Sequence, residues 1–254
     1  MISIPGRGLA HVALACFVLL GGSWIDEGRA DDFAEAIAAT ARGDDEAAVR
    51  HYSRAIQSGE LPADRLIAAH FNRGNALSRR GLYDLAIIDY DAVIEMMPED
   101  ADALDSRGNA YVRKGLYDRA IEDFDNAAKL APDNPRILYN RGNAYFQRGQ
   151  LERAIRDYDA AIGLNPDYAA ALYNRGSIQS DLGNLEKALA DFDRALEAKP
   201  NHAPALFNRG MIYERMGRDE EAEKDFRHAY ALWPGHPAIA AKAKALRLDD
   251  RRPE

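Results

Sequence analysis

The chain has 254 residues, of which 47% are hydrophobic and 29% charged, a composition typical of a globular protein that can bury a core. Its 41 acidic residues outnumber the 33 lysines and arginines and give a formal net charge of −8. This acidic balance argues against nucleic-acid binding, which needs a concentrated basic face. A single cysteine excludes an intramolecular disulfide and a thiolate metal site. Abundant alanine and leucine favour an all-helical fold.

Residues 1–30 have the pattern of a secretory signal peptide. Arg7 supplies a basic start, residues 9–22 are apolar apart from one histidine, and Ala30 is a small residue where a signal peptidase could cut. An uncleaved anchor is an alternative, although a membrane span needs about 20 apolar residues. Lipidation of Cys16 is another, although Cys16 lies inside the apolar run. The sequence predicts export to the bacterial periplasm or the medium, with no stable membrane span after cleavage.

A period of 34 residues governs most of the remaining chain. The tripeptide Asn72-Arg73-Gly74 recurs, with one serine for asparagine, as Ser106-Arg107-Gly108, Asn140-Arg141-Gly142, Asn174-Arg175-Gly176 and Asn208-Arg209-Gly210. A second glycine, an alanine and a proline recur at the same step, as Gly81, Gly115, Gly149, Gly183 and Gly217; Ala86, Ala120, Ala154, Ala188 and Ala222; and Pro98, Pro132, Pro166, Pro200 and Pro234. Several series in one register indicate a repeat architecture.

The period predicts five full units, namely residues 67–100, 101–134, 135–168, 169–202 and 203–236. A degenerate unit at residues 31–66 precedes them. Residues 237–254 are expected to form a C-terminal cap helix and a frayed tail.

Each full unit is expected to form two helices. In the unit 135–168, apolar residues recur at helical spacing on both sides of Gly149, and glycine favours the left-handed conformation that ends a helix. Pro166 blocks continuation of the second helix. Gly142 and Ala154 are small enough to let the two helices approach closely. Because no unit can bury its apolar face alone, the units are expected to stack.

These residues resemble the tetratricopeptide repeat, a family with a 34-residue period. The family pattern stands in one unit as Gly108, Tyr111, Ala120, Phe124, Ala127 and Pro132. The resemblance implies an all-α, right-handed superhelical solenoid of antiparallel helix pairs. It also implies a protein-binding role, because stacked pairs curve around an extended concave surface.

The sequence departs from the family at two positions in every full unit. The family usually has an apolar residue before the packing glycine and an aromatic residue midway along the second helix. Here the first position holds Arg73, Arg107, Arg141, Arg175 and Arg209, and the second holds Asp89, Asp123, Asp157, Asp191 and Asp225. The degenerate unit has Glu35 and His51 instead. Because both changes occur together, we predict Arg–Asp ion pairs that fix the helix packing; an arginine row that binds a ligand is the alternative.

The sequence predicts no catalytic, cofactor-binding or metal-binding residues. The six histidines lack the spacing of metal ligands, and no glycine-rich phosphate loop is present. Carboxylates recur in every unit, whereas a catalytic pair needs one unique constellation. An enzyme is therefore the least favoured class.

The resemblance implies that first-helix side chains line a concave groove that binds a protein or peptide partner of unknown identity. Residues that vary between units are the better ligand candidates, whereas the repeated tripeptide asparagines could instead satisfy backbone groups between units. The candidate groove residues are Phe71, Asn75, Arg79, Asn109, Arg113, Arg136, Tyr139, Asn143, Phe146, Tyr173, Asp181, Phe207, Met211 and Arg215. The alternative functions are a structural protein that associates with itself and an assembly chaperone.

Overall fold

The computed structural model describes residues 30–248. The predicted signal peptide lies outside them except for its last residue, as does the predicted tail from residue 249 onward. The described residues form thirteen α-helices: α1 (Ala30–Ala41), α2 (Asp45–Gln57), α3 (Ala63–Arg79), α4 (Tyr83–Met96), α5 (Ala101–Arg113), α6 (Tyr117–Leu130), α7 (Pro135–Gln147), α8 (Leu151–Leu164), α9 (Ala169–Asp181), α10 (Leu185–Ala198), α11 (Ala203–Arg215), α12 (Asp219–Leu232) and α13 (Pro237–Ala245).

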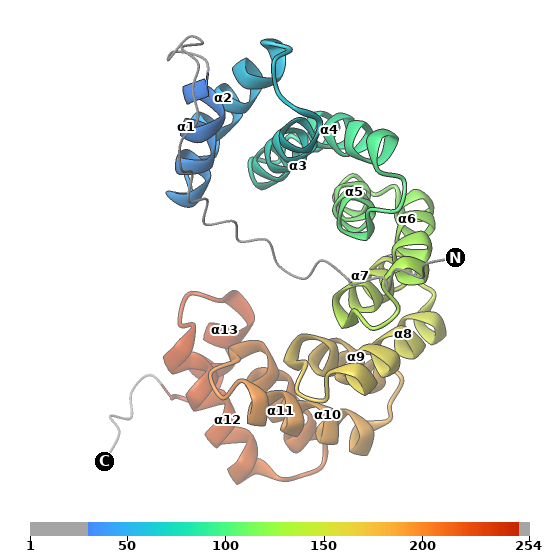
Figure 1. The fold of residues 1–254 in the computed structure, drawn as a ribbon. Helices are drawn as coiled ribbons and strands as arrows, with labels where there is room; N and C mark the ends of the chain where they lie inside the picture. The colour runs from blue at the N-terminus through green and yellow to red at the C-terminus, as the bar shows by residue number, and fades with distance from the viewer. Residues whose placement is uncertain (1–29, 249–254) are drawn as a thin grey trace.

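The helices form consecutive antiparallel pairs that stack into an open arc (Figure 1). The odd-numbered helices from α3 to α11 line the inner, concave side, and the even-numbered helices from α4 to α12 form the outer side. Each helix packs chiefly on its neighbours in the chain. The predicted all-α solenoid of antiparallel helix pairs is confirmed. Between residues 30 and 248, no helix has the length and apolar character needed to cross a membrane.

The second glycine of each full unit ends the inner helix. Gly149 has a φ of +75°, a left-handed conformation that favours glycine. The next amide, of Gln150, donates a hydrogen bond back to the carbonyl oxygen of Tyr145 at 2.8 Å. The chain thereby reverses direction after α7 and starts α8, as the sequence predicts.

The tripeptide glycine lies under a buried aromatic ring of the outer helix. A Cβ atom built on Gly142 would lie only 2.8 Å from Cε1 of Tyr158, so a larger residue would displace the ring. The rings in this place are all buried: Tyr90, Phe124, Tyr158, Phe192 and Phe226. The predicted close approach of the two helices is confirmed.

The Arg–Asp pairs form in all five full units. The Arg141 guanidinium donates to both carboxylate oxygens of Asp157, from Nε at 2.8 Å and from Nη2 at 2.6 Å. Its third nitrogen, Nη1, donates at 2.8 Å to Asp125 of the preceding unit, a contact that the sequence analysis did not predict. The equivalent pairs are Arg73–Asp89, Arg107–Asp123, Arg175–Asp191 and Arg209–Asp225. The ion-pair interpretation is therefore confirmed.

The helix α13 covers the C-terminal end of the stack, where the cap helix is expected. Its Ile239 and Ala243 are buried, and Leu248 beyond its end is also buried. Ala243 and Leu248 pack in one cluster with Phe226 and Tyr213 of the last full unit. The last unit therefore buries its apolar end without a sixth full unit.

Candidate functional site

A cavity of about 270 Å³ opens on the concave side between α7 and α9. Its walls come from the inner helices of two neighbouring units, 135–168 and 169–202, with one residue from α8. The lining residues are Asn143, Phe146, Gln147, Tyr158, Tyr173, Asn174 and Ser177. Three of the predicted groove residues, Asn143, Phe146 and Tyr173, thus lie together.

Hydrogen bonds fix the polar part of this cavity. The Oδ1 atom of Asn143 accepts from the hydroxyl of Tyr158 at 2.7 Å and from Nδ2 of Asn174 at 2.8 Å. Burial raises the pKa of Tyr158, so its phenol remains a donor at neutral pH. With their other atoms engaged, Asn143 Nδ2 can donate to a ligand and Asn174 Oδ1 can accept from one. A peptide backbone needs one acceptor and one donor of this kind.

The apolar part of the cavity has one exposed aromatic anchor. Phe146 lies in the last turn of α7 and is 41% exposed. Tyr173 faces it from α9 but is held by ring contacts, with centroids 5.9 Å from Phe192 and 4.9 Å from His202. A ligand can therefore cover Phe146 without disturbing the core.

The other predicted aromatic residues also belong to the packing between helices. Tyr139 lies 5.9 Å from the ring of Tyr158 and 5.1 Å from that of Tyr168, and is only partly exposed. Phe71 and Phe207 pack in the same way on the buried ring of their own unit. These rings take part in the packing between the inner and outer helices, and their role toward a ligand stays a prediction.

Two predicted groove arginines have partners in the preceding unit. Arg79 donates to the carboxylate of Asp45 from Nη2 at 2.5 Å and from Nε at 2.9 Å. Arg113 donates to the hydroxyl of Tyr83 at 3.0 Å and lies 5.6 Å from the centroid of its ring. The sequence analysis assigned these residues to a ligand because they vary between units, yet the structure gives them contacts within the chain.

A third predicted arginine, Arg136, lies over a buried carboxylate. Asp105 stands where the other full units have an aromatic residue, and it is completely buried. Arg136 contacts it at 2.8 Å and also pairs with Asp102 at 2.6 Å, while Asn140 Nδ2 donates to Asp105 Oδ1 at 2.8 Å. Burial raises the pKa of Asp105, and Arg136 and Asn140 offset part of that effect.

Among the predicted amides, Asn75 accepts from the hydroxyl of Tyr90 at 2.8 Å, as Asn143 does from Tyr158. Asn109 Nδ2 instead donates to the backbone oxygen of Asp105 at 2.8 Å, because the outer helix of its unit has phenylalanine at the tyrosine position. The two amides therefore present different atoms to the groove.

The repeated asparagines connect units, as one interpretation expected, but through side chains. Asn174 and Asn208 each donate at 3.3 Å to a tyrosine hydroxyl on the preceding inner helix, that of Tyr139 and Tyr173 respectively. The expectation that they satisfy backbone groups was wrong in this respect. Backbone groups inside a helix already bond to one another, so a side-chain hydroxyl is an available partner.

Four residues of the cavity are not among the candidate groove residues. Asn174 is one of the repeated asparagines, Tyr158 stands at the buried aromatic position of its unit, and Ser177 stands at the position of Asn143 in the preceding unit. Gln147 carries the clearest overlooked signal, because its position holds Arg79, Arg113, Asp181 and Arg215 in the other full units. Of these, Asp181 and Arg215 lie exposed at the ends of α9 and α11, and the predicted Met211 is half-buried.

The described part of the chain contains no cluster of three or more histidine, cysteine, aspartate or glutamate side chains that could hold a metal ion.

Comparison with known proteins places this geometry in a family. The tetratricopeptide-repeat model matches residues 33–103, 106–169, 139–203 and 173–237. No curated protein sequence matches the chain significantly.

Solved structures are similar in both sequence and fold. A crystal structure of MamA is 30% identical over 63% of this chain and 93% of its own, with a TM-score of 0.57. YrrB, described as a TPR protein with an unusual peptide-binding site, is 27% identical over 76% of this chain and 97% of its own, with a TM-score of 0.57. MamA from Desulfovibrio magneticus RS-1 shares the fold at 22% identity over 67% of this chain and 97% of its own, with a TM-score of 0.59. The chain belongs to the tetratricopeptide-repeat family.

Proposed function

We propose that the protein is an exported scaffold or adaptor that binds a peptide or helix of a partner protein in its concave groove and does not act as an enzyme. The observation that carries this proposal is the cavity between α7 and α9. There an exposed Phe146 adjoins a free amide donor on Asn143 and a free acceptor on Asn174. An apolar anchor beside backbone-like polar groups suits a peptide.

The family relationship supports a binding role without catalysis, because tetratricopeptide repeats are protein-interaction scaffolds. The similarity to YrrB, described as having a peptide-binding site, supports a peptide as the ligand.

The groove is tested by site-specific photo-crosslinking in the native compartment. A photo-reactive phenylalanine analogue at position 146 should crosslink to a partner, whereas the same analogue at the exposed outer position 156 should not. Phe146→Ala should then weaken binding of the captured partner by ~1–3 kcal/mol, as loss of an aromatic anchor does. Arg156→Ala is the matched control. Crosslinking at position 156 alone would refute the groove.

Export rests on the sequence of residues 1–30, with its basic start, apolar run and small residues. Mass spectrometry of the protein from the exported fraction should find a chain that begins after Ala30. Replacing Ala30 by a bulky charged residue should block this processing. An exported chain that still begins at Met1 would contradict a cleaved signal.

A further inference from the structure

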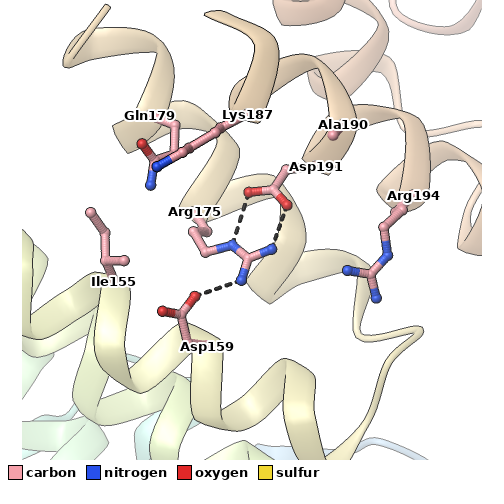
Figure 2. Close-up of a pocket in the computed structure, with 8 residues that line it drawn as sticks. All are labelled: Ile155, Asp159, Arg175, Gln179, Lys187, Ala190, Asp191 and Arg194. Atoms are coloured by element: carbon pink, nitrogen blue, oxygen red, sulfur yellow. Dashed lines mark hydrogen bonds and ion pairs between the residues drawn. The ribbon is translucent and has the colours of Figure 1, made fainter. Parts of the chain in front are cut away.

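A second and larger cavity, of about 470 Å³, lies on the outer side of the arc, and Figure 2 shows the residues that line it. Its lining residues come from the outer helices α8 and α10 and from the inner helix α9. It lies on the side of the helix pairs opposite to the concave groove. Arg175, Asp191 and Asp159 in its lining also form ion pairs within and between units, whereas the proposed peptide groove uses none of its residues.

The cavity lies in a unit that lacks a tyrosine present in three other full units; the unit 67–100 also lacks it and has Leu77 there. The position of Gln179 holds Tyr111, Tyr145 and Tyr213 in three other full units. A second replacement widens the space, since Ala190 stands where the other full units have a larger residue: Ile88, Glu122, Arg156 or Lys224. Both departures from the repeat occur in the unit 169–202, and both residues line the cavity.

Two cations flank the place of the absent ring. In the unit 101–134, the guanidinium carbons of Arg107 and Arg119 lie 5.9 and 5.8 Å from the ring centroid of Tyr111. The residues 68 positions further on, Arg175 and Lys187, line the cavity with no aromatic ring between them. This geometry favours an aromatic guest, because a ring within about 6 Å of two cations gains cation–π attraction from both.

The charges around the cavity favour an acidic neighbour for that ring. Arg175 is engaged by Asp191 and by Asp159, from Nη1 at 2.5 Å, so its charge is already compensated. Lys187 has no hydrogen-bond or ion-pair partner among residues 30–248. Arg194 uses one nitrogen on the carbonyl oxygen of Pro166 at 2.8 Å, which leaves its other donors for a carboxylate.

The phenol of a bound tyrosine would also find a partner. Asp159 corresponds to Asp125 of the preceding unit, and burial together with that carboxylate raises the pKa of the Tyr145 phenol. A hydroxyl in the equivalent place therefore lies near Asp159, whose side chain is 52% exposed and can accept a further hydrogen bond.

We propose that the outer cavity binds a tyrosine side chain of a partner protein, flanked in the partner's sequence by acidic residues. The guest ring replaces the tyrosine that the repeat lacks, between Arg175 and Lys187. The acidic neighbours contact Lys187 and Arg194. The protein would then hold partners on two faces, with different chemistry on each.

NMR titration of the purified chain with the blocked tripeptide acetyl-Glu-Tyr-Glu-amide tests this site. We expect shifts of the backbone amides of Gln179, Lys187 and Ala190, and at least tenfold weaker binding of acetyl-Glu-Ala-Glu-amide. Gln179→Tyr, which restores the repeat residue and fills the cavity, should abolish the shifts. Gln147→Tyr adds a tyrosine on the concave side and should leave them unchanged, as should Phe146→Ala.

Neutralising the cations gives an independent measurement. Lys187→Gln with Arg194→Gln should weaken the peptide at least tenfold and remove most of the salt dependence of binding. Binding that survives Gln179→Tyr, shifts confined to Phe146 and Asn174, or no shifts at millimolar peptide would each overturn the proposal. Intact binding after Phe146→Ala separates this site from the concave groove.

Discussion

At the residue scale, the tripeptide glycine sets the distance between the two helices of a unit. Gly142→Leu should destabilise the fold by ~1–3 kcal/mol or more, because the new side chain would lie where Tyr158 packs. Gly163→Leu is the control, since a Cβ atom at this exposed position of α8 meets nothing within 4 Å. Both changes replace a glycine inside a helix by leucine, so their effects on helix propensity cancel. The difference between the two free energies of unfolding in urea should therefore report the overpacking alone. Equal stabilities would show that the two helices are not in close contact.

The protonation of Asp105 should make the free energy of unfolding depend on pH. Burial raises its pKa above the ordinary value of 3.8, so the folded chain binds this proton more tightly than the unfolded chain. The contribution of Asp105 to the free energy of unfolding is therefore complete at pH values below its ordinary pKa. It is lost as the pH rises through the raised pKa of the folded chain. Asp105→Asn keeps an acceptor for Asn140 and should remove this dependence.

Urea unfolding between pH 4 and pH 7 measures the effect as the difference between wild type and Asp105→Asn, which cancels the other carboxylates. The wild type should lose stability relative to the variant as pH rises. A difference that grows in favour of the wild type would mean that Arg136 outweighs the burial of Asp105.

At the element scale, each arginine that bridges two full units, such as Arg141, joins three helices. Arg141→Leu should cost about 3–5 kcal/mol, because Asp157 is only 6% exposed and would remain as a buried, unpaired charge. Asp125 loses a partner too, but it is accessible enough to be hydrated. The double variant Arg141→Leu with Asp157→Leu should be more stable than Arg141→Leu alone. Chemical denaturation of the two single variants and the double variant gives the coupling energy, and strict additivity would refute the pair.

The series of ion pairs between neighbouring units ends where the stack of units ends. The bridging aspartates are Asp91, Asp125, Asp159 and Asp193, each bound by the arginine of the next unit. In the last full unit the position of these aspartates holds Arg227. No acceptor is needed there, because α13 has Ala243 at the position that would hold the next arginine. At the other end, Ser53 accepts from Arg73 at 3.0 Å. The acceptor is thus an aspartate only between full units.

At the scale of the whole molecule, contacts are mainly between neighbours, so the stack should tolerate the loss of one whole unit. Deleting residues 169–202 brings the unit 203–236 against the unit 135–168. Arg209 then meets Asp159 in place of Asp193, and Asn208 takes the position of Asn174. We expect a cooperatively folded, helical chain with a lower urea midpoint.

The control removes residues 169–198, four fewer, and leaves a fragment that cannot continue the period. Circular dichroism and urea unfolding should show a poorly cooperative chain for this variant. If the deletion of residues 169–202 is equally disrupted, the stack is held by contacts beyond nearest neighbours.

Much of the architecture could be predicted because the signals repeat. The glycine, alanine and proline series predicted where helices end, and the joint occurrence of arginine and aspartate predicted the ion pairs. The bridge from Arg141 to Asp125 was not predictable, because it depends on how one unit lies on the next. The degenerate unit shows the same limit: Asp32 and His51 bond at 2.7 Å in the way that His70 and Asp89 bond at 2.8 Å, with the two residue types exchanged.

The sequence by itself determined the period, the helix pairs and the family, since all three follow from residues fixed relative to their own unit. Only the tertiary structure decided which variable side chains remain available. Arg79, Arg113 and Arg136 vary between units, yet they are held by partners about one period away in the chain. In the sequence, Gln179 is one of two replacements of the repeated tyrosine, the other being Leu77, whereas only the packing of α8, α9 and α10 shows a cavity beside Gln179. The physical reason is that the availability of a side chain depends on its distance from residues of the neighbouring unit. A pattern within one unit carries no information about that distance.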